Sequence, residues 1–357
     1  MRILMMGELS RTGGGQKLLS DIYLSLRNTY RISIITDKNY KSDLGFDNVF
    51  RTSYTYSENL SKIQIFFRVL KLRKEIQAIL KNNSYDLVFN NHPNIFISKG
   101  DINYLHGFSF LDPVIDENGN IKNKLLYEAI KRSGLYRIYD KANFLTHGKY
   151  TMDLSKKMFP LLGIVPGSIE YIFIPSGNFK EVNLRDKENV VLTFGRINRE
   201  KELETVLDTA QRMNDTKFVI AGAVNEGDED YFEMLKKTAP GNVKFIANPD
   251  ENEKAKIFER AKVFLHTRRK EHFGITVAEA ISYGCIPVVP QSGGPWVDIV
   301  ERGKYGLGYI DKPDEQIKYA LGEGIEFTKT ILQSRERFSF ETFREKIIDY
   351  FQRISAK

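Results

Sequence analysis

Short apolar segments alternate with longer segments of helical periodicity, and the alternation restarts after a polar stretch near the middle of the chain. In the first half, five segments are predicted to be buried strands: Arg2–Met6, Arg31–Thr36, Asp86–Asn90, Ile102–His106 and Asn143–His147. The second half repeats the pattern with strands at Val190–Gly195, Lys217–Ala221, Val243–Ala247, Val263–Thr267 and Ile286–Val289. Strands that alternate with helices indicate parallel sheets covered by helices on both faces. We therefore expect an α/β protein with two sheets.

The helical segments between these strands define two predicted domains. Helices are expected at Gln16–Arg27, Glu58–Lys81, Lys122–Tyr139, Thr151–Met158, Glu202–Met213, Glu229–Thr238, Glu251–Arg260, Thr276–Tyr283 and Glu315–Glu323. The polar stretch Pro175–Asn189 lacks periodicity, which predicts domains of residues 1–178 and 179–340. Apolar residues at helical spacing in Glu341–Ile354 predict a last helix, so residues 341–357 are expected to pack back on the first domain.

Composition narrows the class of partner. Residues 1–178 hold 24 Lys/Arg against 16 Asp/Glu, whereas residues 179–357 hold 29 against 30. An ordinary solvated surface explains this asymmetry, and so does an anionic acceptor or membrane that meets the first half, including the basic amphipathic segment Leu60–Leu80. Nucleic acid is not an expected partner, because no nucleic-acid-binding motif is present.

The single cysteine, Cys285, excludes an internal disulfide. It fits a cytoplasmic protein, working at the cytoplasmic face of a membrane if the basic half makes such a contact.

Two glutamates, Glu271 and Glu279, stand eight positions apart around a Phe-Gly pair and a predicted helix start. Carboxylates accept hydrogen bonds from sugar hydroxyls, and the free amides of a helix start bind phosphate. A sugar joined to a nucleotide through a diphosphate needs both kinds of group. The alternative is structural, because Thr276 and Glu279 have the spacing of a capping box and Glu271 could be an ordinary loop carboxylate.

Three further strand-end segments carry candidate site residues. Gly13–Gly15 follows the first strand and precedes a helix, so its backbone can approach a ligand closely, or it is simply a flexible loop. Arg196 and Lys201 follow a strand and can neutralise a diphosphate, or they belong to a solvated helix start. His106 ends a predicted strand and can face a ligand, although structural histidines are commoner.

Two other histidines remain outside this set. His92, before Pro93, is interpreted as a turn residue, and His147 is left without an assigned role.

Together these segments resemble the retaining nucleotide-sugar glycosyltransferases of family 4, which have the GT-B fold. The matching motifs are Glu271–Glu279 as E-x7-E, Gly195-Arg196 with Glu200-Lys201, Gly13–Gly15, Tyr104-Leu105-His106 and Phe144–Thr151. His147 and Gly148 depart from the usual Asn-Ser of the last motif. The resemblance implies two Rossmann-like domains facing across a cleft, with the C-terminal helix crossing back to the N-terminal domain.

Within that family, the dolichol-pathway mannosyltransferases show the most similar motifs. The shared runs are Glu271–Ile275, Ser292–Pro295 and Asp298–Val300. The resemblance implies GDP-mannose as the donor and a lipid-linked glycan as the acceptor, with UDP-glucose or UDP-GlcNAc as alternative donors. A donor of this kind is a substrate, and no cofactor or metal is implied.

The resemblance also implies roles for individual residues. Glu279 would bind the ribose diol, Glu271 the donor sugar, and Arg196 with Lys201 the diphosphate. His106 would contact the donor sugar near its reacting carbon. The remaining implied donor-binding residues are Gly14, Gly15, Phe273, Gly274, Ile275 and Thr276.

Two other classes of function stay open at this point. A sugar-nucleotide epimerase would convert the donor without an acceptor, and a phosphorylase would depend on phosphate. A binding module would hold a nucleotide-sugar without turnover.

Overall fold

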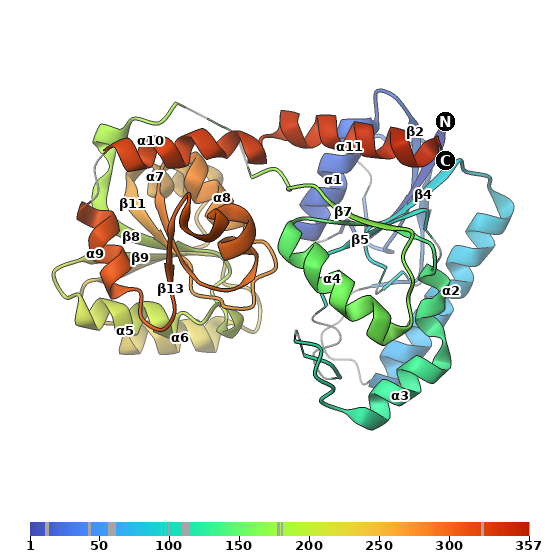
Figure 1. The fold of residues 1–357 in the computed structure, drawn as a ribbon, viewed down its shortest axis with the longest axis horizontal. Coiled ribbons are helices and arrows are strands. Elements are labelled where there is room, and N and C mark those ends of the chain that lie inside the picture. Colours follow the sequence, from blue (N-terminus) through green and yellow to red (C-terminus); the bar gives the residue numbers. More distant parts are fainter. Residues whose placement is uncertain are drawn as a thin grey trace. The chain divides into compact units, whose positions relative to one another are not determined.

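The computed structural model describes residues 1–10, 14–41, 44–55, 62–93, 95–96, 98, 100–108, 114–116, 118–176, 179, 181–322 and 325–356. Gly13, the start of the predicted helix Glu58–Lys81 and parts of the predicted domain boundary lie outside these residues. Two compact units are present (Figure 1). Unit 1 comprises Met1–Pro175 and Phe340–Lys357, and unit 2 comprises Ser176–Ser339.

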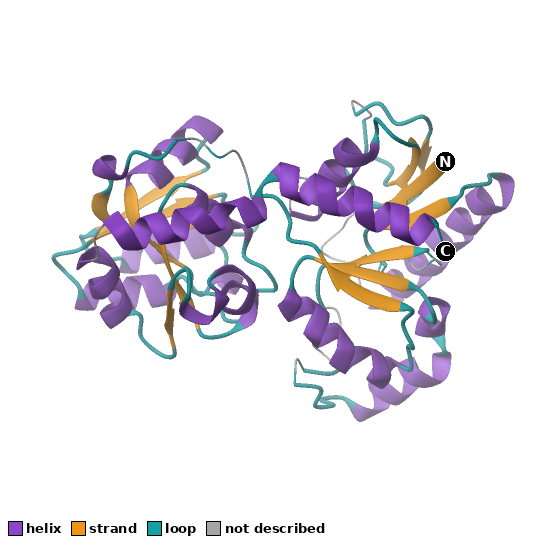
Figure 2. Cartoon of the chain, turned by 45° about the horizontal axis from the view of Figure 1, so that its top comes forward, coloured by secondary structure: helices purple, strands orange, loops and turns teal. Residues whose placement is uncertain are grey.

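Unit 1 is built on a seven-stranded parallel sheet with the strand order β3-β2-β1-β4-β5-β6-β7. Its strands are β1 Arg2–Met6, β2 Arg31–Thr36, β3 Val49–Arg51, β4 Leu87–Asn90, β5 Ile102–Leu105, β6 Asn143–Thr146 and β7 Ser168–Tyr171. Its α-helices are α1 Gly14–Leu26, α2 Lys62–Asn82, α3 Lys124–Ser133, α4 Lys149–Leu162 and α11 Phe340–Ser355. The central strands are buried, as expected for parallel strands covered on both faces (Figure 2).

Unit 2 repeats the architecture with a six-stranded parallel sheet in the order β10-β9-β8-β11-β12-β13. Its strands are β8 Glu188–Phe194, β9 Lys217–Gly222, β10 Val243–Ala247, β11 Ala261–Leu265, β12 Ile286–Pro290 and β13 Leu307–Tyr309. Its α-helices are α5 Glu204–Arg212, α6 Glu229–Thr238, α7 Glu251–Arg260, α8 Ile275–Ser282, α9 Asp314–Gly322 and α10 Ile325–Gln333. Two doubly wound parallel sheets confirm the predicted fold class.

The predicted packing of the C-terminal helix on the first unit is also confirmed. Helix α11 contacts α1 within unit 1. The ring of Phe351 lies 5.7 Å from that of Phe89 on β4. Two residues further along the helix, Arg353 pairs with Glu170 on β7 at 2.8 Å. The apolar stripe that predicted this helix is therefore the face that it buries.

Some elements differ from the predictions. The predicted helix Lys122–Tyr139 is interrupted, because Gly134 adopts the left-handed conformation with φ 61° and ends α3. A 3₁₀ turn over Leu135–Tyr139 follows. Four elements were not predicted at all, namely β3, β7, β13 and α10. The three strands have three or four residues each and are mostly half-buried, so they lack the apolar run of a central strand.

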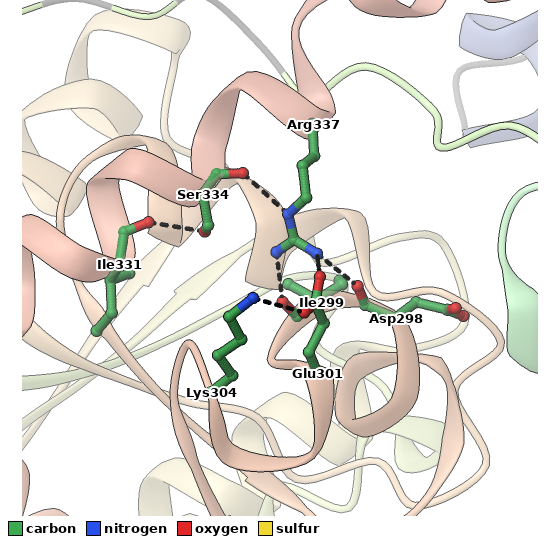
Figure 3. Close-up of polar contacts among 7 residues, drawn as sticks. All are labelled: Asp298, Ile299, Glu301, Lys304, Ile331, Ser334 and Arg337. Atoms are coloured by element: carbon green, nitrogen blue, oxygen red, sulfur yellow. Dashed lines mark hydrogen bonds and ion pairs between the residues drawn. The ribbon is translucent and has the colours of Figure 1, made fainter.

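One half-buried arginine, Arg337, connects segments at the end of unit 2 (Figure 3). Its guanidinium donates to the carbonyls of Asp298 and Ile299 at 3.1 and 2.7 Å and to the Glu301 carboxylate at 2.6 Å. It also donates to the Ser334 carbonyl at 3.0 Å. The carbonyls of Asp298 and Ile299 lie at the end of the turn Pro295–Ile299, so Arg337 satisfies backbone groups that would otherwise lack partners.

Replacing Arg337 with lysine is expected to destabilise unit 2 by about 1–3 kcal/mol, because an ammonium cannot reproduce the fork of donors. The matched control is Glu301→Gln, which removes the ion pair and leaves the carbonyl contacts in place. Urea unfolding of both variants measures the difference. If Arg337→Lys has the same urea-unfolding midpoint as the wild type, the geometry of the guanidinium contributes nothing to stability.

The helices of the described ranges include none that is long and apolar enough to span a membrane.

Candidate functional site

The candidate site in unit 2 lies at the carboxyl ends of two neighbouring parallel strands, β8 and β11. Strand β8 is followed by Gly195 and Arg196, and β11 is followed by the loop 266–274. Both loops leave the same edge of the sheet, which is where α/β sheets bind ligands. The backbone is tightly packed there, since a Cβ atom on Gly222 would lie 1.7 Å from the Gly195 carbonyl oxygen.

Lys201 and Glu271, predicted separately from sequence, form an ion pair. The Lys201 Nζ donates to Glu271 Oε2 at 2.7 Å, and Nη1 of Arg268 lies 3.8 Å from the same oxygen. The side chains of Lys201 and Glu271 are only 20% and 16% exposed. Burial by itself would raise the pKa of Glu271, but the charges of Lys201, of His266 in its protonated form and of Arg268 outweigh it and lower the pKa to about 2. Glu271 is therefore anionic at neutral pH.

This pKa predicts how stability depends on pH. The pKa of Glu271 falls from an ordinary value of 4.5 to about 2, so its ion pair stabilises the folded state above pH 4.5. The contribution disappears as the pH falls toward 2. We expect the unfolding free-energy difference between wild type and Glu271→Gln to shrink over that range. Glu200→Gln is the control, because Glu200 also faces Arg268 but is 61% exposed. A pH-independent difference for Glu271→Gln would contradict the assignment.

His266, directly after β11, was not identified from sequence. It is 5% exposed, and its Nε2 is a buried atom without a hydrogen-bond partner in the described part of the chain. Burial lowers its pKa to about 4, so the ring is neutral at physiological pH. The side chain lines a narrow cavity together with Arg196 and Lys201. Its position near the end of a predicted strand could have identified His266, because the same kind of position identified His106.

Arg196 and the start of α8 complete this edge of unit 2. Arg196 is exposed, and none of the ion pairs found between described residues includes it. Helix α8 begins at Ile275 after Gly274, and its first amide groups, including that of Thr276, have no intrahelical partner. Gly274 has φ 89°, and a Cβ there would lie 2.8 Å from Pro295, so glycine is required. These amides can bind an anion.

Phe273 has a different environment from the one expected of a ligand contact. Its side chain is 4% exposed and packs edge-on against Phe338, with ring centroids 6.1 Å apart. The Phe273 side chain is therefore part of the core of unit 2, and only the main chain of Phe273 is available to a ligand. Among the described residues, no group of three or more His, Cys, Asp or Glu side chains could hold a metal ion.

The capping-box interpretation of Glu279 is wrong. The residue that precedes α8 is Gly274, with no side-chain cap, so Thr276 lies inside the helix and cannot cap it. Glu279 instead pairs with Lys254 on α7 at 3.0 Å. The side chains of Lys254 and Glu279 are 19% and 13% exposed. The two predicted carboxylates therefore have separate cationic partners.

In unit 1, the predicted residues Gly15 and His106 lie together. A Cβ on Gly15 would lie 3.3 Å from His106 Cε1 and 3.0 Å from His92 Nε2. Gly14 is the first residue of the same helix, α1. His106 donates from Nε2 to the Asn91 carbonyl at 2.9 Å. This arrangement brings the start of α1 against the residue that follows β5.

His92 was interpreted only as a turn residue, but its ring stacks on His106. The ring centroids are 4.8 Å apart with an interplanar angle of 21°. Burial, and then the neighbouring His106, lowers the pKa of His92 well below its ordinary value. The ring is therefore neutral at physiological pH. His147, in contrast, is buried with Nε2 3.0 Å from the Thr151 hydroxyl within α4.

Comparison with known proteins gives a family match for unit 2. Residues 177–338 match the family model described as glycosyl transferases group 1. A GDP-Man:Man(3)GlcNAc(2)-PP-Dol alpha-1,2-mannosyltransferase of Dictyostelium discoideum is 27% identical over 46% of this chain and 37% of its own length. A glycogen synthase of Elusimicrobium minutum is 28% identical over 47% of this chain and 33% of its own. The aligned region thus spans about a third of each of these relatives.

Solved structures show the same fold over the whole chain. A sucrose-phosphate synthase from Thermosynechococcus elongatus superposes with a TM-score of 0.75 at 15% identity, covering 99% of both chains. Anabaena HepE, solved in complex with UDP and glucose, superposes with a TM-score of 0.70 at 18% identity, covering 98% of this chain and 99% of its own. These likenesses establish the GT-B fold.

Proposed function

We propose that the chain is a retaining hexosyltransferase of the group 1 glycosyltransferases, family 4, that uses a nucleotide-sugar donor, because residues 177–338 match that family and the chain has the GT-B fold. The observation that carries this proposal is the strand-end cluster of unit 2. There Lys201 and Arg268 face the anionic Glu271, and Arg196 lines the same narrow cavity as Lys201. Cations for a diphosphate and a carboxylate for sugar hydroxyls are thus gathered at one edge of one sheet.

The donor-binding roles follow from this chemistry. Arg196 and Lys201 bind the diphosphate, together with the free amides of Gly274–Thr276 at the start of α8. Glu271 accepts hydrogen bonds from the donor sugar. Glu279 accepts them from the ribose, with Lys254 holding its carboxylate in place.

The reaction proceeds with retained configuration at the transferred carbon. The acceptor hydroxyl attacks from the face that the diphosphate leaves, a new carbon–oxygen bond forms and the bond to the diphosphate oxygen breaks. The leaving diphosphate takes the proton of the hydroxyl. Lys201 and Arg196 stabilise the negative charge that develops on the leaving group.

Unit 1 supplies the groups for the sugar and the acceptor. His106 contacts the donor sugar near its reacting carbon, and His92 keeps the plane of that ring in place by stacking. Gly14 and Gly15 let the donor approach the backbone at the start of α1, where a Cβ on Gly15 would lie 3.0 Å from the His92 ring. The acceptor is a glycan or a lipid-linked molecule.

GDP-mannose is the donor that the local motifs favour, in agreement with the name of the Dictyostelium relative. UDP-glucose is the alternative, supported by the likeness to HepE, which was solved with UDP and glucose. The base must be distinguished by groups outside the motifs described above.

A thermal-shift screen with GDP-mannose, UDP-glucose, UDP-GlcNAc and UDP-galactose tests the proposal. A ligand at 100 times its dissociation constant stabilises a protein by about 2.7 kcal/mol, so a true donor is expected to raise the melting temperature by several degrees. Free mannose and glucose are the controls and should give no shift. If none of the four donors stabilises the protein, the proposed function is wrong.

A further inference from the structure

Unit 1 contains a cavity of about 260 Å³, and most of the residues that line it have no donor-binding role. Strand β5, strand β6, the Leu135–Tyr139 turn and helix α4 all contribute residues to its wall. The wall also includes His92, His106 and Gly15. The cavity therefore adjoins the residues at which the proposed function places the transferred sugar.

The inner wall is apolar and largely aromatic. Phe108, Phe144 and Phe159 contribute rings, with the Phe144 and Phe159 centroids 4.4 Å apart, and Leu162 and Ile164 add aliphatic surface. The described residues that line the cavity include no Asp, Glu, Lys or Arg. Transfer of an apolar group from water into a cavity of this composition is favourable. A charged group would find no side chain of opposite charge there.

Tyr104 supplies an unsatisfied polar atom at the same cavity. Its side chain is fully buried, and its hydroxyl has no hydrogen-bond partner in the described ranges. Burial raises the pKa of Tyr104 far above its ordinary value, so the hydroxyl keeps its proton and can donate it. Burying a hydroxyl without a partner is costly, and such groups in folded proteins usually mark a site for a missing partner.

We propose that this cavity binds the apolar group of the acceptor, an alkyl or aryl group joined through an oxygen to the part that receives the sugar. The assignment rests on the proposed function, because it takes the ligand to be the acceptor. An apolar cavity of 150 Å³ holds a benzene molecule, so 260 Å³ accommodates roughly ten carbon atoms. The linking oxygen accepts the hydrogen bond that Tyr104 lacks.

Calorimetric titration of the full chain with octyl β-glucoside and methyl β-glucoside tests the assignment. We expect the octyl compound to bind at least about ten-fold more tightly, because its chain leaves water for the cavity. Leu162→Phe fills the cavity and should weaken octyl binding about ten-fold. Leu154→Phe is the matched control, since Leu154 lies on the same helix and is also 6% exposed but does not line the cavity. Equal binding of the two glucosides, or equal loss in the two variants, would overturn the assignment.

Tyr104→Phe gives a second test that does not depend on the folding of Leu162→Phe. Removing an unpaired buried hydroxyl should leave the melting temperature unchanged or raise it, while octyl glucoside binding weakens several-fold. A lower melting temperature with unchanged binding would show that the hydroxyl is structural and would refute its role.

Nucleotide-sugar binding separates this inference from the proposed function. The donor thermal shift should persist in Leu162→Phe, because Leu162 has no donor-binding role and the cations and carboxylates proposed to hold the nucleotide lie in unit 2. Donor binding without octyl glucoside binding refutes the cavity assignment alone. Octyl glucoside binding without any donor shift refutes the proposed function and leaves the apolar site standing.

Discussion

Lys201→Ala is expected to lower turnover of the donor by about 10²–10³-fold, the loss measured when one electrostatic stabiliser of a transition state is removed. In the free protein the ammonium lies 2.7 Å from Glu271, and in the reaction it faces the charge that develops on the leaving diphosphate. The assay is the rate of nucleoside diphosphate release at a saturating donor concentration. A rate within a few-fold of the wild type would rule out Lys201 as the main neutralising group.

Controls must separate catalysis from folding, because Lys201→Ala also leaves the Glu271 carboxylate without its nearest cation. Adding Glu271→Gln should recover much of the lost stability but none of the lost turnover. Arg199→Ala is the matched surface control, since Arg199 lies in the same short 3₁₀ helix but stacks on Tyr231 instead. It should keep turnover within about three-fold, as expected of a surface substitution.

Glu279→Ala is expected to weaken donor binding about 10- to 100-fold. A hydrogen bond to a charged group contributes about 1.5–3 kcal/mol, and 1.4 kcal/mol corresponds to a factor of ten. If Glu279 holds the ribose, the loss should appear for the free nucleotide as well as for the nucleotide-sugar. Calorimetric titration of both ligands measures it.

Glu251→Gln is the control for Glu279, because both carboxylates approach Lys254, Glu251 at 3.7 Å and Glu279 at 3.0 Å. Glu251 is 90% exposed and has no proposed ligand role, so its variant should bind donor normally. Unchanged nucleotide affinity in Glu279→Ala would contradict the ribose role. Equal weakening in both variants would assign the effect to Lys254 instead.

The sequence predicted the central strands but missed three of the four edge strands, β3, β7 and β13, for a physical reason. A buried parallel strand is a continuous apolar run, and such runs predicted β1 and β2 with the ends that the structure gives them. Strand β3 at the sheet edge has three residues, and none of them is fully buried. An edge strand of only three or four mostly half-exposed residues leaves no apolar run in the sequence, and it forms because a neighbouring strand pairs with it.

The residue types of the candidate site were predictable, but their pairings were not. Lys201 and Glu271 are 70 residues apart and meet because β8 and β11 are neighbours, an order that no local pattern contains. The Thr-x-x-Glu spacing at Thr276 indicated a helix start, but a left-handed Gly274 starts the helix earlier. The contacts of His92 and His266 were missed because the sequence does not reveal what surrounds a single histidine side chain in the fold.

The most direct test of the central claim is whether the cations of unit 2 bind a diphosphate. We would titrate wild type and Lys201→Met with GDP, GMP, UDP and UMP. For one of the two bases, the wild type should bind the diphosphate at least about ten-fold more tightly than the monophosphate, and Lys201→Met should lose most of that preference. A preference that is absent in the wild type, or unchanged in Lys201→Met, would contradict the account.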